Sequence, residues 1–192
     1  MTQQSNPMER ASNYLHRQGA KSFEELEALM GQSGDDWSAC LRGVSEEQAA
    51  FQPEPSEHIR TPVSGDGPRW CVKEVVGHYL VTERSLNSTV AGLAGVAPPA
   101  DPGTIVREMG AQSADYEALS LDALGEELSE FFAETVRLIG ALRGSENLDA
   151  TFPHPVFGPL NTKEWLAFHG LHAMDHIRQI EQIKTNEAYP KA

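Results

Sequence analysis

Histidines are the residues of this 192-residue chain whose type and spacing best indicate chemistry. Three of the seven, His169, His172 and His176, fall on one apolar segment near the C-terminus, at spacings that put them on the same face of a helix. His172 and His176 are four residues apart, so their side chains rise side by side and can bind one ion. Such pairs also occur on solvated helix faces, so this pair alone does not decide the matter.

A third candidate ligand lies far away in the sequence. His78 is inside the apolar segment WCVKEVVGHYLVTE. A single histidine on an apolar face is usually a core residue bonded to a carbonyl or a carboxylate. Three imidazoles that meet in one core, however, leave lone pairs without donors, at a cost of about 1–3 kcal/mol each. One divalent cation satisfies all three, and we therefore predict a metal site made of His78, His172 and His176.

Neutral imidazoles suit zinc, nickel, copper or iron better than magnesium or calcium. Three protein ligands leave at least one open position, which is typical of catalytic zinc sites. Water or a thiol in that position would have a lowered pKa and would be a nucleophile at neutral pH. The alternative is an inert bound ion.

Four further side chains are candidates for supporting roles. His169, one turn before His172, is our candidate catalytic acid or base; its alternatives are a hydrogen-bond donor that supports the site and a simple core residue. Glu74 and Gln179 each lie one turn from a predicted ligand and are candidates to orient an imidazole. His154 precedes the last helix and is a candidate to lie over the mouth of the site.

Four long helices must position these residues. Ser22 and Glu25 form a capping box at the start of a helix to about residue 41. The others are expected from about 68 to 93, from Ser120 to about 143, and from Asn161 to about 184, with a weaker helical segment at 104–117. Residues 52–69 and 145–161 are expected to be irregular, residues 94–119 form a further long connection that contains this weaker segment, and no strand alternation is evident.

This pattern predicts an all-α fold, a four-helix bundle with crossover connections, because the long connections exceed what simple helical hairpins need. We expect the bundle domain at residues 22–185, a flexible N-terminal arm at 1–21 and a C-terminal tail at 186–192. The chain is long enough to bury a core without a metal ion, so the ion would serve function more than folding.

Composition excludes several classes of partner. The net charge of −13, from 15 basic and 28 acidic residues, repels nucleic acids and anionic membrane surfaces. No apolar run approaches the roughly 18 residues of a membrane span. The polar opening MTQQSNPMER has no signal-peptide core, so we expect a cytoplasmic protein whose Cys40 and Cys71 are reduced.

Two motifs resemble those of a known superfamily. The segment from Trp70 through VGHYL to Glu83 is similar to the "W…HL…E" pattern in the second helix of the DinB-like (YfiT-like) proteins. NTKEWL at 161–166, followed by HAMDHIRQI at 172–180, resembles the last helix of the same superfamily. The resemblance extends from about Trp37 to Ile183. Tyr79 stands where a leucine-like residue often follows the first histidine, which affects the expected shape of the pocket.

The resemblance implies a crossover four-helix bundle, a homodimer, and a zinc or nickel ion on His78, His172 and His176. It also implies a metal-dependent S-transferase that activates a low-molecular-weight thiol, as a cosubstrate, to attack a small electrophile. A mycothiol-dependent isomerase-like enzyme is one alternative. A non-catalytic metal-binding or stress-response module is another, and a helical scaffold without an ion is a third.

Overall fold

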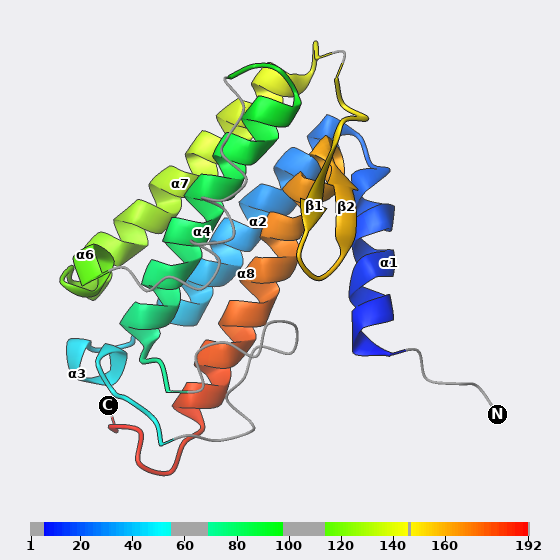
Figure 1. Cartoon of the computed structure of the whole chain (residues 1–192). Coiled ribbons are helices and arrows are strands. Elements are labelled where there is room, and N and C mark those ends of the chain that lie inside the picture. The colour runs from blue at the N-terminus through cyan, green and yellow to red at the C-terminus, as the bar shows by residue number, and fades with distance from the viewer. Residues whose placement is uncertain (1–5, 55–68, 98–113, 146, 192) are drawn as a thin grey trace.

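The computed structural model describes residues 6–54, 69–97, 114–145 and 147–191 (Figure 1). Four long helices form the body of the molecule: α2 (Phe23–Leu41), α4 (Val72–Leu93), α7 (Leu121–Leu142) and α8 (Thr162–Lys184). The shorter elements are α1 (Pro7–Gly19), α3 (Glu46–Ala49), α6 (Ala114–Glu117) and the strands β1 (Thr151–His154) and β2 (Gly158–Asn161).

Local capping interactions explain where the predicted helices begin. Ser22 and Asn161 each form a capping box with a glutamate three residues later, at the starts of α2 and α8. Ser120 accepts a hydrogen bond from the Ala123 amide at the start of α7. The predicted beginnings of these three helices are therefore confirmed. Residue 68, where the other long helix was expected to begin, and residues 104–113 lie outside the described residues.

The packing of the long helices confirms the crossover bundle. Both α2 and α4 pack against α7 and against α8, so α2 and α4 occupy opposite corners (Figure 1). Three connections join the four long helices in sequence order. Two of them, from α2 to α4 and from α7 to α8, join helices at opposite corners, so the chain has to cross the end of the bundle there. Trp37 of α2 and Tyr79 of α4 meet across the centre, with ring centroids 4.9 Å apart. As a result, α4 and α8, which are distant in sequence, lie directly side by side.

The N-terminal residues differ from our expectation. The flexible arm predicted for residues 1–21 is wrong for residues 7–19, which form α1 and pack along α8 (Figure 1). Asn6 caps this helix, Leu15 is fully buried, and His16 contacts Glu164 of α8 with 2.5 Å between Nδ1 and Oε1. The helix has few apolar residues, so the polar sequence concealed it.

The segment before α8 also differs from our expectation. Part of the connection at 145–161 is an antiparallel hairpin in which Thr151 pairs with Asn161 and His154 with Gly158. Three prolines interrupt the alternation that would have indicated strands. Gly158 has a φ of +74°, a left-handed conformation that favours glycine. The hairpin leads directly into the start of α8 and fixes how that helix enters the bundle.

Two further observations concern the C-terminal tail and the hydrophobicity of the helices. In the C-terminal tail, the Pro190 carbonyl accepts a hydrogen bond from Gln48 at 2.8 Å, and Tyr189 packs on Phe51. Within the described part of the chain, no helix combines the length and apolar character that crossing a membrane requires.

Candidate metal centre

The structure brings the three predicted ligands together between α4 and α8. His78, His172 and His176 each offer one potential ligand atom, and these atoms lie within 4.8 Å of one another. His78 and His176 are buried, and the side chain of His172 is 13% exposed. The crossover topology makes this meeting possible because it places α4 against α8.

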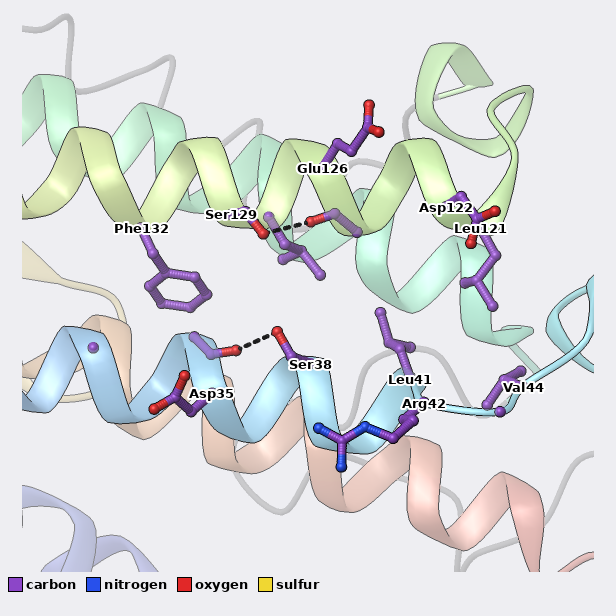
Figure 2. A pocket seen from close by; sticks show the side chains of 15 residues that line it. Asp35, Ser38, Leu41, Arg42, Val44, Leu121, Asp122, Glu126, Ser129 and Phe132 are labelled. Atoms are coloured by element: carbon purple, nitrogen blue, oxygen red, sulfur yellow. Dashed lines mark hydrogen bonds between the residues drawn. The ribbon is translucent and has the colours of Figure 1, made fainter.

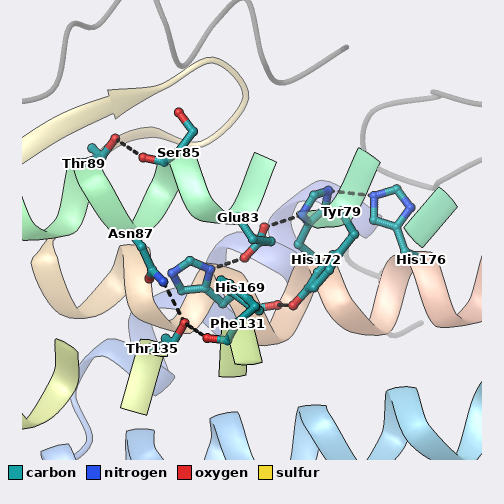
Figure 3. Close-up of polar contacts among 10 residues, drawn as sticks. All are labelled: Tyr79, Glu83, Ser85, Asn87, Thr89, Phe131, Thr135, His169, His172 and His176. Atoms are coloured by element: carbon teal, nitrogen blue, oxygen red, sulfur yellow. Dashed lines mark hydrogen bonds and ion pairs between the residues drawn. The ribbon is translucent and has the colours of Figure 1, made fainter. Parts of the chain in front are cut away.

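Hydrogen bonds donated by Nδ1 fix the orientation of two of the three imidazole rings. His172 Nδ1 donates to Glu83 Oε1 at 2.5 Å, and His176 Nδ1 donates to Gln179 Oε1 at 2.9 Å. These two Nε2 atoms face each other at 2.7 Å, and in the neutral rings, whose hydrogens are on Nδ1, both of them carry lone pairs (Figure 3). Facing lone pairs without a donor are unfavourable. A divalent cation resolves this arrangement, so the donor set fits a metal ion.

The environment keeps His176 neutral, as a metal ligand must be. Burial lowers the pKa of His176 well below its ordinary value, and the neighbouring His172 and His78 lower it further. The hydrogen bond to Gln179 acts in the opposite direction but is the smallest contribution. The His78 ring also packs on Trp70, with centroids 4.7 Å apart.

Glu83 is part of the site, and our sequence analysis did not predict a role for it. It is fully buried on α4, and its two oxygens accept hydrogen bonds from Nδ1 of His172 and Nδ1 of His169 (Figure 3). Burial raises the pKa of Glu83, but the two histidines outweigh burial and bring it well below its usual range. The carboxylate is therefore ionised. Our sequence analysis named Glu83 only as part of a motif, although a carboxylate inside an apolar helix was itself a signal.

His169 lies next to the three predicted ligands, and its side chain forms a hydrogen bond with Glu83. The side chain is fully buried, and its Nε2 atom has no hydrogen-bond partner. Tyr79 of α4 donates a hydrogen bond to the His169 carbonyl at 3.4 Å. His169 thus lies between the ligand-bearing part of α8 and the core.

The other candidate residues have distinct positions. Gln179 orients His176 as predicted. Glu74 accepts hydrogen bonds at the start of α4, from the Cys71 amide at 2.6 Å and from the Gln52 side chain. Burial raises the pKa of Cys71 to about 11, which keeps it a thiol at neutral pH. His58 lies outside the described residues.

His154 is buried in the hairpin, next to the aromatic residues of α8. Its ring packs on Phe157, Trp165 and Phe168, and Phe168 in turn stacks on His172 with centroids 5.3 Å apart. His154 Nδ1 accepts hydrogen bonds from the amides of Val156 and Phe157. One aromatic ring, that of Phe168, therefore lies between His154 and the predicted ligand His172.

A separate groove lies between α2 and α7, away from the histidines (Figure 2). Its volume is about 940 Å³, and glycine and serine residues of both helices make room for it. Asp35, Asp122 and Glu126 line it together with Arg42. None of the predicted metal ligands lines this groove, so it is not part of the centre.

Comparison with known protein families now bears on the same residues. The sequence model described as the DinB superfamily matches residues 29–180, most of the chain, and this range includes all three ligands. The chain belongs to the DinB superfamily. No curated protein and no solved structure matches it. The superfamily assignment and the three-histidine cluster agree on a site, while a particular reaction has to be argued from chemistry.

Proposed function

We propose that this DinB-superfamily chain is a metal-dependent S-transferase that joins a low-molecular-weight thiol to a small electrophile. The observation that carries the proposal is the facing pair of Nε2 atoms on His172 and His176, with His78 beside them. Three neutral imidazoles are a donor set for zinc or nickel. When bound, such an ion is a Lewis acid that lowers the pKa of a thiol and so supplies thiolate at neutral pH.

The reaction can be written with its atoms balanced for an alkyl chloride. The thiol loses its proton to solvent or a base, its sulfur forms a bond to the electrophilic carbon, and chloride leaves with the electron pair of the broken bond. The products are a thioether, a proton and chloride. In this scheme His78, His172 and His176 hold the ion, and Glu83 and Gln179 hold two of the rings.

Charge at the site favours an anionic sulfur. The three ligands are neutral in the bound state, and the buried carboxylate of Glu83 contacts one of them, His172. A divalent ion together with Glu83 leaves one positive charge, which stabilises a single thiolate in a low-dielectric site. The net charge of the chain is −13, so the protein as a whole does not attract anions. Any preference for a thiolate therefore has to come from the charge at the metal site itself.

Two measurements test the proposal in order. Elemental analysis of untagged protein should find about one zinc or nickel ion per chain. Monochlorobimane and a series of cellular thiols, bacillithiol and mycothiol among them, should then give metal-dependent thioether formation that chelation abolishes and added metal restores. Absence of metal-dependent turnover with every thiol would reject the transferase. Maleylpyruvate assayed with mycothiol tests the isomerase-like alternative.

The second candidate function is a non-catalytic metal-binding or stress-response module. Burial favours it, because His78 and His176 are almost completely enclosed and only the His172 side chain retains 13% exposure. A bound ion that exchanges slowly, together with no turnover, would support this candidate. A homodimer and a cytoplasmic location remain predictions, and light scattering on the purified protein checks the first.

A further inference from the structure

The contacts of Glu83 indicate a role beyond that of a buried ion-pair partner. Its two oxygens contact two different imidazoles of α8, those of His169 and His172, while Glu83 itself is on α4 (Figure 3). The side chain is fully buried, as is that of His169. Buried charges of this kind rarely add net stability compared with apolar residues of the same size. The cluster therefore calls for a functional explanation.

We propose that Glu83 is the positioning residue of the metal centre, and that His169 acts through Glu83. The inference rests on the proposed function only in so far as His172 is a metal ligand. In this arrangement Glu83 holds the hydrogen of His172 on Nδ1, so the Nε2 lone pair is available on the side of the ring that faces His176. His169 donates to the second carboxylate oxygen and prevents the carboxylate from rotating.

The geometry supports orientation as the mechanism. A histidine ring whose Nδ1 has no acceptor can carry its hydrogen on either nitrogen, and the Nε2–H form cannot bind a metal through Nε2. Gln179 performs the corresponding task for His176, at 2.9 Å. The centre thus has one acceptor for each of two ligands, and Glu83 is the charged one. Loss of such an acceptor typically weakens metal binding about 10- to 100-fold.

The proposal assigns His169 a different role from the acid or base predicted from the sequence. The Nδ1 atom of His169 is occupied by Glu83, and its Nε2 atom is buried without a partner. A residue that only anchors Glu83 can be replaced by another hydrogen-bond donor of similar reach. A residue that transfers protons to a substrate cannot. His169→Gln therefore separates the two roles.

The experiment measures Co²⁺ and Zn²⁺ affinity by competition with a chromophoric chelator, and the Co²⁺ absorption spectrum reports the ligand geometry. We expect Glu83→Gln, which keeps one acceptor oxygen, to weaken binding about 10-fold, and Glu83→Ala about 100-fold. Glu127→Gln is the matched control, since it removes a carboxylate that pairs with an arginine, Arg84, instead of with a histidine. Its metal affinity should stay within about twofold of the wild type, because the half-buried Glu127 pairs with Arg84 and not with a histidine of the centre.

A second measurement does not depend on any variant folding. Long-range ¹H–¹⁵N NMR of the metal-free wild type should show His172 with its hydrogen on Nδ1. An Nε2–H tautomer, or wild-type affinity in both Glu83 variants, would overturn the proposal. His169→Gln should retain affinity within about threefold while His169→Leu weakens it about 10-fold. Equal, unchanged affinities in the two His169 variants would reject the anchoring role.

The proposal and the proposed function fail in different ways. If the wild type binds no divalent ion, the metal centre is rejected, while the tautomer of His172 still shows whether Glu83 orients that ring. If the ion binds and depends on Glu83 but no thiol is consumed, only the transferase reaction is rejected. Loss of turnover in His169→Gln with unchanged metal affinity would show that His169 is also an acid or base, and would contradict the claim that it acts only through Glu83.

Discussion

His154 makes the stability of this protein depend on pH in a way that one substitution can remove. The residue is 3% exposed, and its Nδ1 atom accepts hydrogen bonds from the amides of Val156 at 3.0 Å and Phe157 at 3.3 Å. The ring is therefore neutral. Burial, and next the neighbouring His172, lower its pKa to about 4. Asparagine at this position keeps an oxygen that can accept from the turn amides but does not titrate.

The sign and size of the effect follow from linkage. In the unfolded chain a histidine has a pKa of about 6.5, so at mildly acidic pH the unfolded state binds a proton that the native state does not. The contribution of His154 to stability is complete above about pH 7 and is lost as the pH falls towards 4. Each pKa unit corresponds to about 1.36 kcal/mol, and integration from pH 7 to pH 5 gives a loss of about 2 kcal/mol.

Urea unfolding at pH 5, 6, 7 and 8, with a chelator present, measures this directly. The free energy of unfolding of the wild type should fall by about 2 kcal/mol more than that of His154→Asn between pH 7 and pH 5. His176, whose pKa burial also lowers, is present in both proteins, so its contribution largely cancels in the difference. Between pH 7 and pH 8 the difference should be constant, which is the internal control. Parallel profiles down to pH 5 would refute the reasoning.

Four further substitutions test other parts of the structure. His172→Ala should remove most bound metal, measured by elemental analysis, and lower the melting temperature only modestly, because the apolar core does not depend on the ion; global unfolding would instead make the ion structural. Leu15→Ala should lower the free energy of unfolding in urea by at least about 2 kcal/mol, because Leu15 is fully buried; an unchanged value would mean that α1 is not integral to the fold. Gly31→Ala should raise the free energy of unfolding in urea by about 0.5–1 kcal/mol, since its Cβ meets open space. Gly170→Ala should gain less, because its Cβ would lie 3.2 Å from Leu29; an equal gain would contradict the close approach of α2 and α8.

The long helices could be predicted because their signals are local. Ser120 and Asn161 cap helices through contacts within three residues, and the apolar periodicity of these segments continues over several turns. The elements that were missed depend on contacts distant in sequence. The helix α1 is held by Leu15 and by the contact between His16 and Glu164, which become visible only once α8 is in place. The prolines of the hairpin hide a pairing that is set by its turn.

The ligands were predictable for a different reason. His172 and His176 are a local pair, and His78 was distinctive because it interrupts an apolar helix. Glu83 interrupts the same helix five residues later, yet its function depends on which atoms of α8 lie opposite it. Helical periodicity places a side chain on a face but does not identify the partner across the interface. The position of Glu83 between His169 and His172 therefore required the structure.

The energetics of this buried cluster argue that the centre exists for its chemistry. A core that already contains Trp37, Trp165 and Phe131 does not need charged groups to be stable. Moving a carboxylate such as Glu83 and its imidazole partners out of water costs several kcal/mol, and such a buried cluster rarely adds net stability compared with apolar residues of similar volume. Facing Nε2 atoms at 2.7 Å between His172 and His176 add a further unfavourable contact. A fold selected for stability alone would replace these groups with leucine or phenylalanine. A bound cation reverses the balance, because the lone pairs become ligands and the carboxylate becomes the counter-charge.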